Sequence, residues 1–230
     1  TSLKDINAPR AKLVFSLNPY GKYYDQLSQL RWGWSNRLDA ELASKIASSV
    51  LARSYGEAKG KDETNLTLYQ DQDGGMQLLP YGSSDLDLSF VAAIYADPYM
   101  DKIRLESFFD KILEKQTANL DELCMALAGK AAMKLPVLND IKMFLNHQKD
   151  LGSRERLILA YGLAALGDSA GANEILDYLL KNNRREEGDA LMLDDLEMTA
   201  LAGATAALAS HVEAQNFFNA VTKYDTSRTL

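Results

Sequence analysis

Apolar residues recur at three- and four-residue steps along most of the chain, which is the spacing of one face of an α-helix. The clearest early case is "SNRLDAELASKIASSVLARSYG", residues 35–56. We expect a helix here that Ser35 or Asn36 caps and Gly56 ends. Shorter helices are expected at 24–33 and 64–70.

From residue 102 onward the same pattern repeats as a series of apolar stripes separated by a few polar or Gly residues. Connections this short make successive helices antiparallel neighbours, so the pattern predicts helical hairpins in series. The expected helical segments are 102–116, 119–133, 136–148, 153–167, 169–183, 194–210 and 212–224.

The expected helices are of two kinds. "LAYGLAALGD" (159–168) and "LAGATAALAS" (201–210) carry small residues on more than one face, so neighbours can approach them from several sides. "FFDKILEKQ" (108–116) and "EILDYLLKNN" (174–183) have one apolar and one charged face. Inner and outer helices that alternate along the chain are typical of either an open superhelix or a closed α/α barrel.

Residues 68–90, "LYQDQDGGMQLLPYGSSDLDLSF", interrupt this helical pattern. The Asp-Gly-Gly sequence predicts a turn in which Gly74 and Gly75 take positive φ. Ser84 or Asp85 is expected to cap the Ala-rich helix that follows.

Composition narrows the possible partners. A hydrophobic fraction of 47% with 25% charged residues is typical of a soluble globular protein. The net charge of -7 argues against nucleic acid as a partner, because phosphate binding needs clustered Lys and Arg. The sequence has no run of about 18 apolar residues, so we expect no membrane insertion by this segment. The single Cys124 excludes an internal disulfide and is expected to be a buried structural thiol.

A resemblance to a known family rests on an ordered set of features: "LYQDQDGGM", a Pro-Gly turn, Ser-Ser-Asp, "LSFVAAIYA", and later "ERLILAYGLAALGDSAGANEILDYLL". This order resembles the thioester-containing domain of the alpha-2-macroglobulin and complement family, particularly its bacterial members. That domain belongs to the α/α-toroid group, together with terpenoid cyclases and protein prenyltransferases. The resemblance covers about residues 35–220 and is strongest over 66–96 and 153–182.

The resemblance implies an all-α fold in which helical hairpins close into a barrel with inner and outer rings. The Gln-x-x-Asp-Gly-Gly turn would join an outer helix to an inner one. We accordingly expect a lead-in arm and short helix at 1–34 and a single α/α-toroid domain at 35–230. Because the chain opens on "TSLKDINAPR", we interpret it as a fragment of a longer polypeptide.

The family's internal thioester joins a Cys and a Gln in Cys-x-Glu-Gln, usually after Pro-Tyr-Gly. Here "NPYGKYYDQLSQL" supplies Pro19–Gly21, and Asp25 and Gln26 resemble the acidic-Gln pair at a spacing one residue too long. Lys22 occupies the Cys position, and Cys124 lies about a hundred residues downstream. The resemblance therefore implies a scaffold without the covalent trap.

Enzymes of the toroid group supply further candidate chemistry. "DLDL" offers Asp85 and Asp87 but lacks the last acid of the Asp-x-Asp-Asp cluster of terpenoid cyclases, and an aromatic lining is not evident. We interpret Asp85 as a helix cap and Asp87 as support for the first helical turn. The zinc site of prenyltransferases needs Asp, Cys and His, whereas His147 and His211 are both distant from Cys124 in sequence. We expect no metal and no cofactor.

A carbohydrate-active barrel would need two carboxylates across a cleft. Acidic candidates are Asp73, Asp85, Asp87, Asp194 and Asp195, but 32 Asp and Glu in the chain give no basis for selecting a pair. "LDDLEMTALAG" is better explained as a helix start, and "KNNRREEGD" as a solvated loop. Trp32 and Trp34 could stack on a sugar or a partner surface, although we favour packing against the core.

Together these features predict a non-catalytic α/α-toroid domain of a macroglobulin-like exported protein, periplasmic or at the cell surface. Its expected partners are neighbouring domains of a larger chain or another protein. Two alternatives stay open: an enzyme of the toroid group acting on an isoprenoid or polysaccharide, and an open helical-repeat scaffold in the cytoplasm. The binding candidates are Trp32, Trp34, Asp73, Asp85 and Asp87.

Overall fold

The computed structural model describes residues 21, 23–32, 35–57, 65–95, 99–183, 185–187, 190–192 and 196–228. They divide into two compact units, residues 1–64 and residues 65–230, whereas the sequence placed the division after residue 34. The described residues are mostly helical, and their strands form two short antiparallel ladders. The all-α prediction is confirmed.

The first unit contains a helical hairpin of α1 (Tyr24–Arg31) and α2 (Leu38–Tyr55). The ring of Tyr24 meets that of Tyr55 edge-on at 5.5 Å between centroids, and Leu38 and Leu51 are fully buried. The contact with α1 explains why α2, which we expected in the second domain, belongs to the first unit.

The two ends of α2 test the predicted caps. Gly56 ends the helix with φ +67°, as expected for a left-handed C-terminal residue. The N-terminal prediction was wrong, because Arg37 occupies the cap position and makes no side-chain capping bond. Ser35 instead accepts a hydrogen bond from the backbone N–H of Arg37 at 3.1 Å.

The second unit holds the predicted series of helices. Its elements are the 3₁₀ helix η3 (Leu66–Tyr69), β1 (Met76–Gln77), β2 (Ser84–Asp85), α3 (Leu86–Tyr95), α4 (Lys102–Glu114), α5 (Leu120–Ala132), α6 (Leu138–His147), α7 (Ser153–Ala165), α8 (Ser169–Asn183), β3 (Arg185–Glu187), β4 (Ala190–Met192), α9 (Leu196–Ala209) and α10 (Ala214–Arg228). The helix expected at 64–70 is a 3₁₀ turn, and part of the predicted "KNNRREEGD" loop pairs as β3 with β4.

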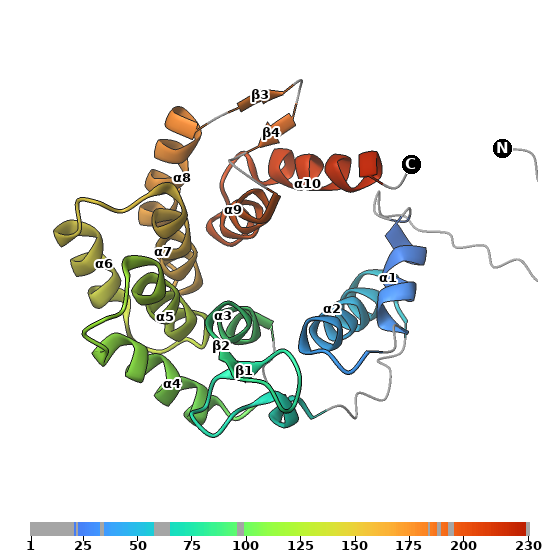
Figure 1. The fold of residues 1–230 in the computed structure, drawn as a ribbon. Helices are drawn as coiled ribbons and strands as arrows, with labels where there is room; N and C mark the ends of the chain where they lie inside the picture. Colours follow the sequence, from blue (N-terminus) through green and yellow to red (C-terminus); the bar gives the residue numbers. More distant parts are fainter. Residues whose placement is uncertain are drawn as a thin grey trace, which may run out of the picture. The chain divides into compact units, whose positions relative to one another are not determined.

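Within residues 65–230 the helices lie in two rows (Figure 1). In the first row α5 packs between α3 and α7, and α7 packs on α9. In the second row α4 packs on α5, α6 on α7, α8 on both α7 and α9, and α10 on α9. The chain thus alternates between rows, as the alternating composition of its helices predicted.

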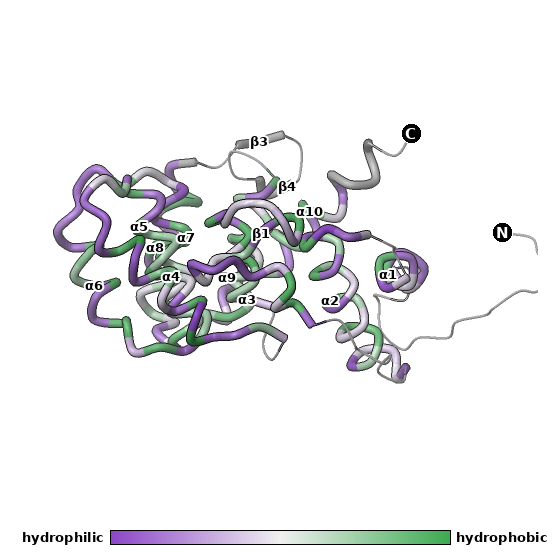
Figure 2. Tube along the Cα trace, turned by 60° about the horizontal axis from the view of Figure 1, so that its bottom comes forward, coloured by the Kyte–Doolittle hydropathy of each residue, from purple (hydrophilic) through white to green (hydrophobic). Residues whose placement is uncertain are grey.

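Helix α7 shows why small residues are needed in the first row. Beyond a charged first turn, every residue from Leu157 to Ala165 is buried. Figure 2 colours the trace by residue hydropathy, and green hydrophobic stretches run through the helices of this unit. Gly162 lies so close to α5 and α6 that an added Cβ would be 2.9 Å from Cδ1 of Ile141 and 3.4 Å from Cα of Ala128. The prediction that neighbours approach "LAYGLAALGD" from several sides is confirmed over residues 159–165.

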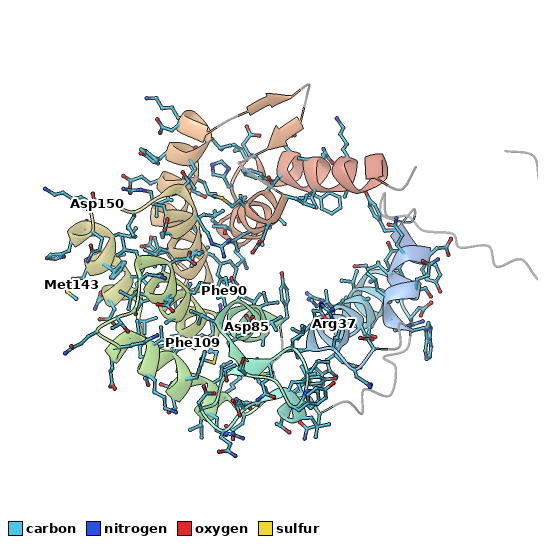
Figure 3. The ribbon with its side chains drawn as sticks, viewed as in Figure 1. Arg37, Asp85, Phe90, Phe109, Met143 and Asp150 are labelled. Carbon is cyan, nitrogen blue, oxygen red and sulfur yellow. The ribbon has the colours of Figure 1, made fainter. Side chains whose placement is uncertain are left out.

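Helices α4 and α5 pack in a similarly close way. Asp101 caps α4 by accepting from the N–H groups of Ile103 and Arg104, and α4 buries Leu105, Phe108 and Phe109. Phe109, labelled in Figure 3, is fully buried and packs directly over Gly129 of α5. The absent side chain of Gly129 therefore provides the space that this ring fills.

Candidate functional site

A pocket of about 190 Å³ lies between α3, α7 and α9 of the second unit. Most of its lining is apolar or aromatic, and its charged residues all belong to the first turns of the three helices. The lining residues are Asp87, Phe90, Val91, Ile94 and Tyr95 from α3, Arg154, Leu157, Ile158 and Tyr161 from α7, and Glu197, Met198, Ala200, Leu201 and Ala204 from α9.

Arg154 organises the charged end of this pocket. Its guanidinium lies 3.0 Å from the carboxylate of Asp87, 3.1 Å from that of Asp121 and 3.6 Å from that of Glu197. These acids come from the first turns of α3, α5 and α9, while Arg154 comes from the first turn of α7. The N-termini of all four first-row helices therefore meet, and these helices run parallel.

Helix dipoles explain the signs of these charges. Acidic side chains are favourable in a first helical turn, whereas an Arg there is unfavourable unless carboxylates surround it. Burial lowers the pKa of Arg154, but Asp121, Glu197 and Asp87 more than offset this and the pKa is raised. Three carboxylates around one guanidinium leave an excess of two negative charges at this end of the pocket.

Aromatic side chains form the apolar part of the site. Phe90 extends from α3 toward α7 (Figure 3), and its ring meets that of Tyr161 edge-on, with centroids 5.9 Å apart and an interplanar angle of 88°. Burial, together with the nearby Tyr95, raises the pKa of Tyr161 to about 12. An aromatic lining was not evident from the sequence, and the structure shows one that comprises Phe90, Tyr95 and Tyr161.

The two acids that the sequence singled out in "DLDL" have separate roles. Asp85 accepts a hydrogen bond from the N–H of Leu88 at 2.9 Å, which confirms its prediction as the cap of α3. Asp87 lies at the pocket rim in the first turn of α3, and its side chain is 63% exposed. Neither is a buried acid of the kind that protonates a substrate, because both are open to solvent.

Asp73 lies in a compact hydrogen-bonded turn between η3 and α3. Its carboxylate accepts from the N–H of Gly75 at 2.9 Å and from the hydroxyl of Ser84 at 2.5 Å. The amide of Gln70, which is buried, donates to the carbonyls of Gly74 and Asp101, both at 2.9 Å. Asp73 is therefore a structural residue of the turn, and the pocket lining does not include it.

The two glycines of this turn are required for different reasons. Gly74 has φ +100°, as predicted. Positive φ was wrongly predicted for Gly75. Gly75 is needed because an added Cβ would be 2.7 Å from both the ring of Phe108 and Cβ of Ser84. Its role is close packing of the turn on α4.

The other predicted site residues lie either in the first unit or outside the described residues. Trp32 does not pack into the core of its own unit, since it is 68% exposed, and Arg31 lies over its ring at 5.3 Å. Trp34, Asp194 and Asp195 lie outside the described residues, as do Pro19, Tyr20 and Lys22 of the thioester-like sequence.

The surroundings of Cys124, His211 and His147 explain these residues by packing or hydrogen bonding alone. Cys124 is fully buried in α5, and burial raises its pKa to about 12, with smaller effects from Glu155 and Asp121. His211 is largely buried and lies 3.1 Å from the carboxylate of Asp177. His147 is exposed and bonds the carbonyl of Met143. Within the described part of the chain, no group of three or more His, Cys, Asp or Glu residues could hold a metal.

Sequence reasoning missed Arg154, Tyr95 and Tyr161. An available signal was that the expected first turns of α3, α5 and α9 are acidic, whereas "SRER" at the start of α7 is the exception with two Arg. That contrast identifies Arg154 or Arg156 as a bridging cation. The sequence carries no comparable signal for Tyr95 and Tyr161, because each lies in a helix that is apolar on several faces.

No protein-family model matches this chain, and neither a curated protein nor a solved structure matches it. Among the described residues, no helix combines the length and apolar character needed to cross a membrane.

Proposed function

We propose that residues 65–230 belong to a non-catalytic domain of the α/α-toroid type in a macroglobulin-like exported protein. Its role is to bind neighbouring domains of a longer chain or another protein. The observation that carries this proposal is the pocket between α3, α7 and α9, which combines an apolar lining with carboxylates held by Arg154. Binding pockets typically have this composition, with mostly apolar walls and a few polar groups.

The toroid assignment is supported by the arrangement of the helices. Parallel first-row helices α3, α5, α7 and α9 alternate with second-row helices along the chain, and their N-termini share one cation. An α/α toroid is built by continuing this alternation around an axis. Two parts of the proposal, the export and the macroglobulin-like parent protein, rest on the family resemblance of the sequence.

The surroundings of the acidic side chains favour a binding role over catalysis. General acid catalysis needs a carboxyl whose environment keeps it protonated near neutral pH. Asp87 and Glu197 are instead 63% and 75% exposed to solvent, and each is paired with the guanidinium of Arg154. Asp85 has its carboxylate occupied by a helix cap.

The binding role predicts that the pocket accepts a neutral aromatic ring. Fluorobenzene is the probe, and its fluorine NMR line is followed as the 230-residue protein is added. We expect the line to broaden in a saturable way. Ala204→Phe, which fills the pocket from α9, should abolish the broadening. Ala207→Phe on the exposed face of α9 is the matched control and should leave it unchanged.

Circular dichroism of both variants establishes that they fold. No saturable broadening with the wild-type protein would contradict the proposed binding role. Equal broadening by wild type and a folded Ala204→Phe variant would place the ring elsewhere and also contradict it.

The absence of a thioester gives a second expected result. The protein incubated with methylamine should show no adduct and no autolytic fragment by intact mass. Cys124 should react with iodoacetamide at pH 8 only after urea is added, because burial removes access and a pKa of about 12 leaves about a thousandfold less thiolate than a free thiol has. A methylamine adduct, or alkylation of the folded protein at the rate seen in urea, would refute this part of the proposal.

A further inference from the structure

The size of the pocket between α3, α7 and α9 limits its occupant to about one ring. Sites for drug-sized ligands span about 300–1,000 Å³, whereas this pocket has about 190 Å³. An apolar cavity of about 150 Å³ is known to accept benzene. A single large side chain, presented by a partner surface, therefore matches the pocket better than a whole cofactor or lipid does.

The charged side chains at the pocket rim determine which kind of group can lie beside that ring. The side chains of Asp87 and Glu197 are 63% and 75% exposed, so a ligand cation can reach both of them. Arg154 already pairs with these two and with Asp121, which leaves an excess of two negative charges. A cation can approach the two exposed carboxylates directly, whereas an anion would have to compete with them for Arg154.

Tyr161 supplies a polar group to the lining of the pocket. It lines the pocket and is only 5% exposed. Among the described residues its hydroxyl makes no hydrogen bond, and its ring contact is with Phe90. The hydroxyl is available at the pocket wall, so an occupant that hydrogen-bonds to it would gain orientation.

We propose that the pocket takes an aromatic side chain of a protein partner that has Lys or Arg as its next residue. The ring enters between Phe90, Tyr161 and Leu201, and the cation lies between Asp87 and Glu197. Buried aromatic anchors beside a charged rim are the usual centres of protein–protein binding energy. This inference rests on the proposed binding function and specifies the chemistry of the partner.

Two capped tetrapeptides test the charge preference. One is acetyl-Gly-(4-fluoro-Phe)-Lys-Gly-amide, and the other has Glu in place of Lys. Each is titrated with the 230-residue protein and followed by fluorine NMR. We expect the Lys peptide to bind about two- to fivefold more tightly, the range for exposed ion pairs. Added salt should reduce that ratio.

Three variants assign the preference to the rim. Glu197→Gln and Asp87→Asn should each lower the ratio of the two affinities toward one. Glu174→Gln, which removes an exposed carboxylate from α8 outside the pocket, is the matched control and should leave the ratio unchanged. Equal binding of the two peptides, or a ratio that survives both rim variants, overturns the inference.

The outcomes also separate this inference from the proposed function. Fluorobenzene binding without a preference for the Lys peptide refutes the charged anchor and leaves the binding role intact. If 4-fluorophenethylamine binds as tightly as the Lys peptide, the occupant is a free organic cation, and the commitment to a protein partner is wrong. Loss of binding by all probes refutes both.

Discussion

Replacing Gly74 by Ala should lower the free energy of unfolding of the second unit by about 3 kcal/mol or more. Gly74 has φ +100°, a conformation that costs a residue with a Cβ about 1–2 kcal/mol. The added Cβ would also lie 2.7 Å from the carbonyl carbon of Arg104, which belongs to the backbone of α4 and cannot rotate away. Urea unfolding followed by circular dichroism measures the loss.

Gly167→Ala is the matched control for Gly74→Ala. Gly167 follows α7 with φ +88°, but an added Cβ there would have no atom within 4 Å. It should cost only the conformational part, about 1 kcal/mol. Equal losses for the two variants would mean that the close approach of the turn to Arg104 contributes nothing.

The effect of Gly74 matters for the pocket because this turn leads directly into α3. Gln70 and Asp73 hold the turn, Ser89 of α3 donates to the carbonyl of Asp85, and the N–H of Met76 donates to the hydroxyl of Ser89. The turn thereby fixes where α3 begins, and with it the position of Asp87 at the rim. The "DQDGG" sequence thus supports the candidate site without being part of it.

The helices were predictable from the sequence because each is specified locally. α7 and α8 begin at the predicted Ser153 and Ser169, and α2 ends at the predicted Gly56. The apolar pattern of each helix, and the Gly stops after α2 and α7, lie within one segment, so no long-range information is needed. The two-residue strands β1 and β2 were not predicted, because their pairing depends on the turn that Gln70 and Asp73 assemble.

The candidate site was only partly predictable, because its residues come together from distant parts of the chain. Asp87 was recognised because "DLDL" is a local motif, but its partner Arg154 is 67 residues further along the chain. Glu197 and Asp121 join it only because first-row helices run parallel and bring their first turns together. Helix periodicity indicates which face is buried and carries no information on which first turns meet.

The second large effect concerns the contact between Phe109 and Gly129, which joins α4 to α5. A Cβ on Gly129 would be 2.7 Å from Cε2 of Phe109, and Phe109 is fully buried, so the ring has no free space to move into. Ala has a higher helix propensity than Gly by about 1 kcal/mol, which partly offsets the clash. We expect Gly129→Ala to lower the free energy of unfolding by about 2 kcal/mol net.

A double-mutant cycle separates this steric conflict from other effects of the substitution. Phe109→Leu alone should cost about 1 kcal/mol, because it shortens the side chain that contacts Gly129. Combined with Gly129→Ala, it should cost at least about 1 kcal/mol less than the sum of the two single changes, since the smaller side chain accommodates the new methyl group. Gly203→Ala lies on α9 against Phe217 and should be additive with Phe109→Leu. If Gly129→Ala and Phe109→Leu are also additive, the ring and the glycine are not coupled, and α4 and α5 are held together by the rest of their interface.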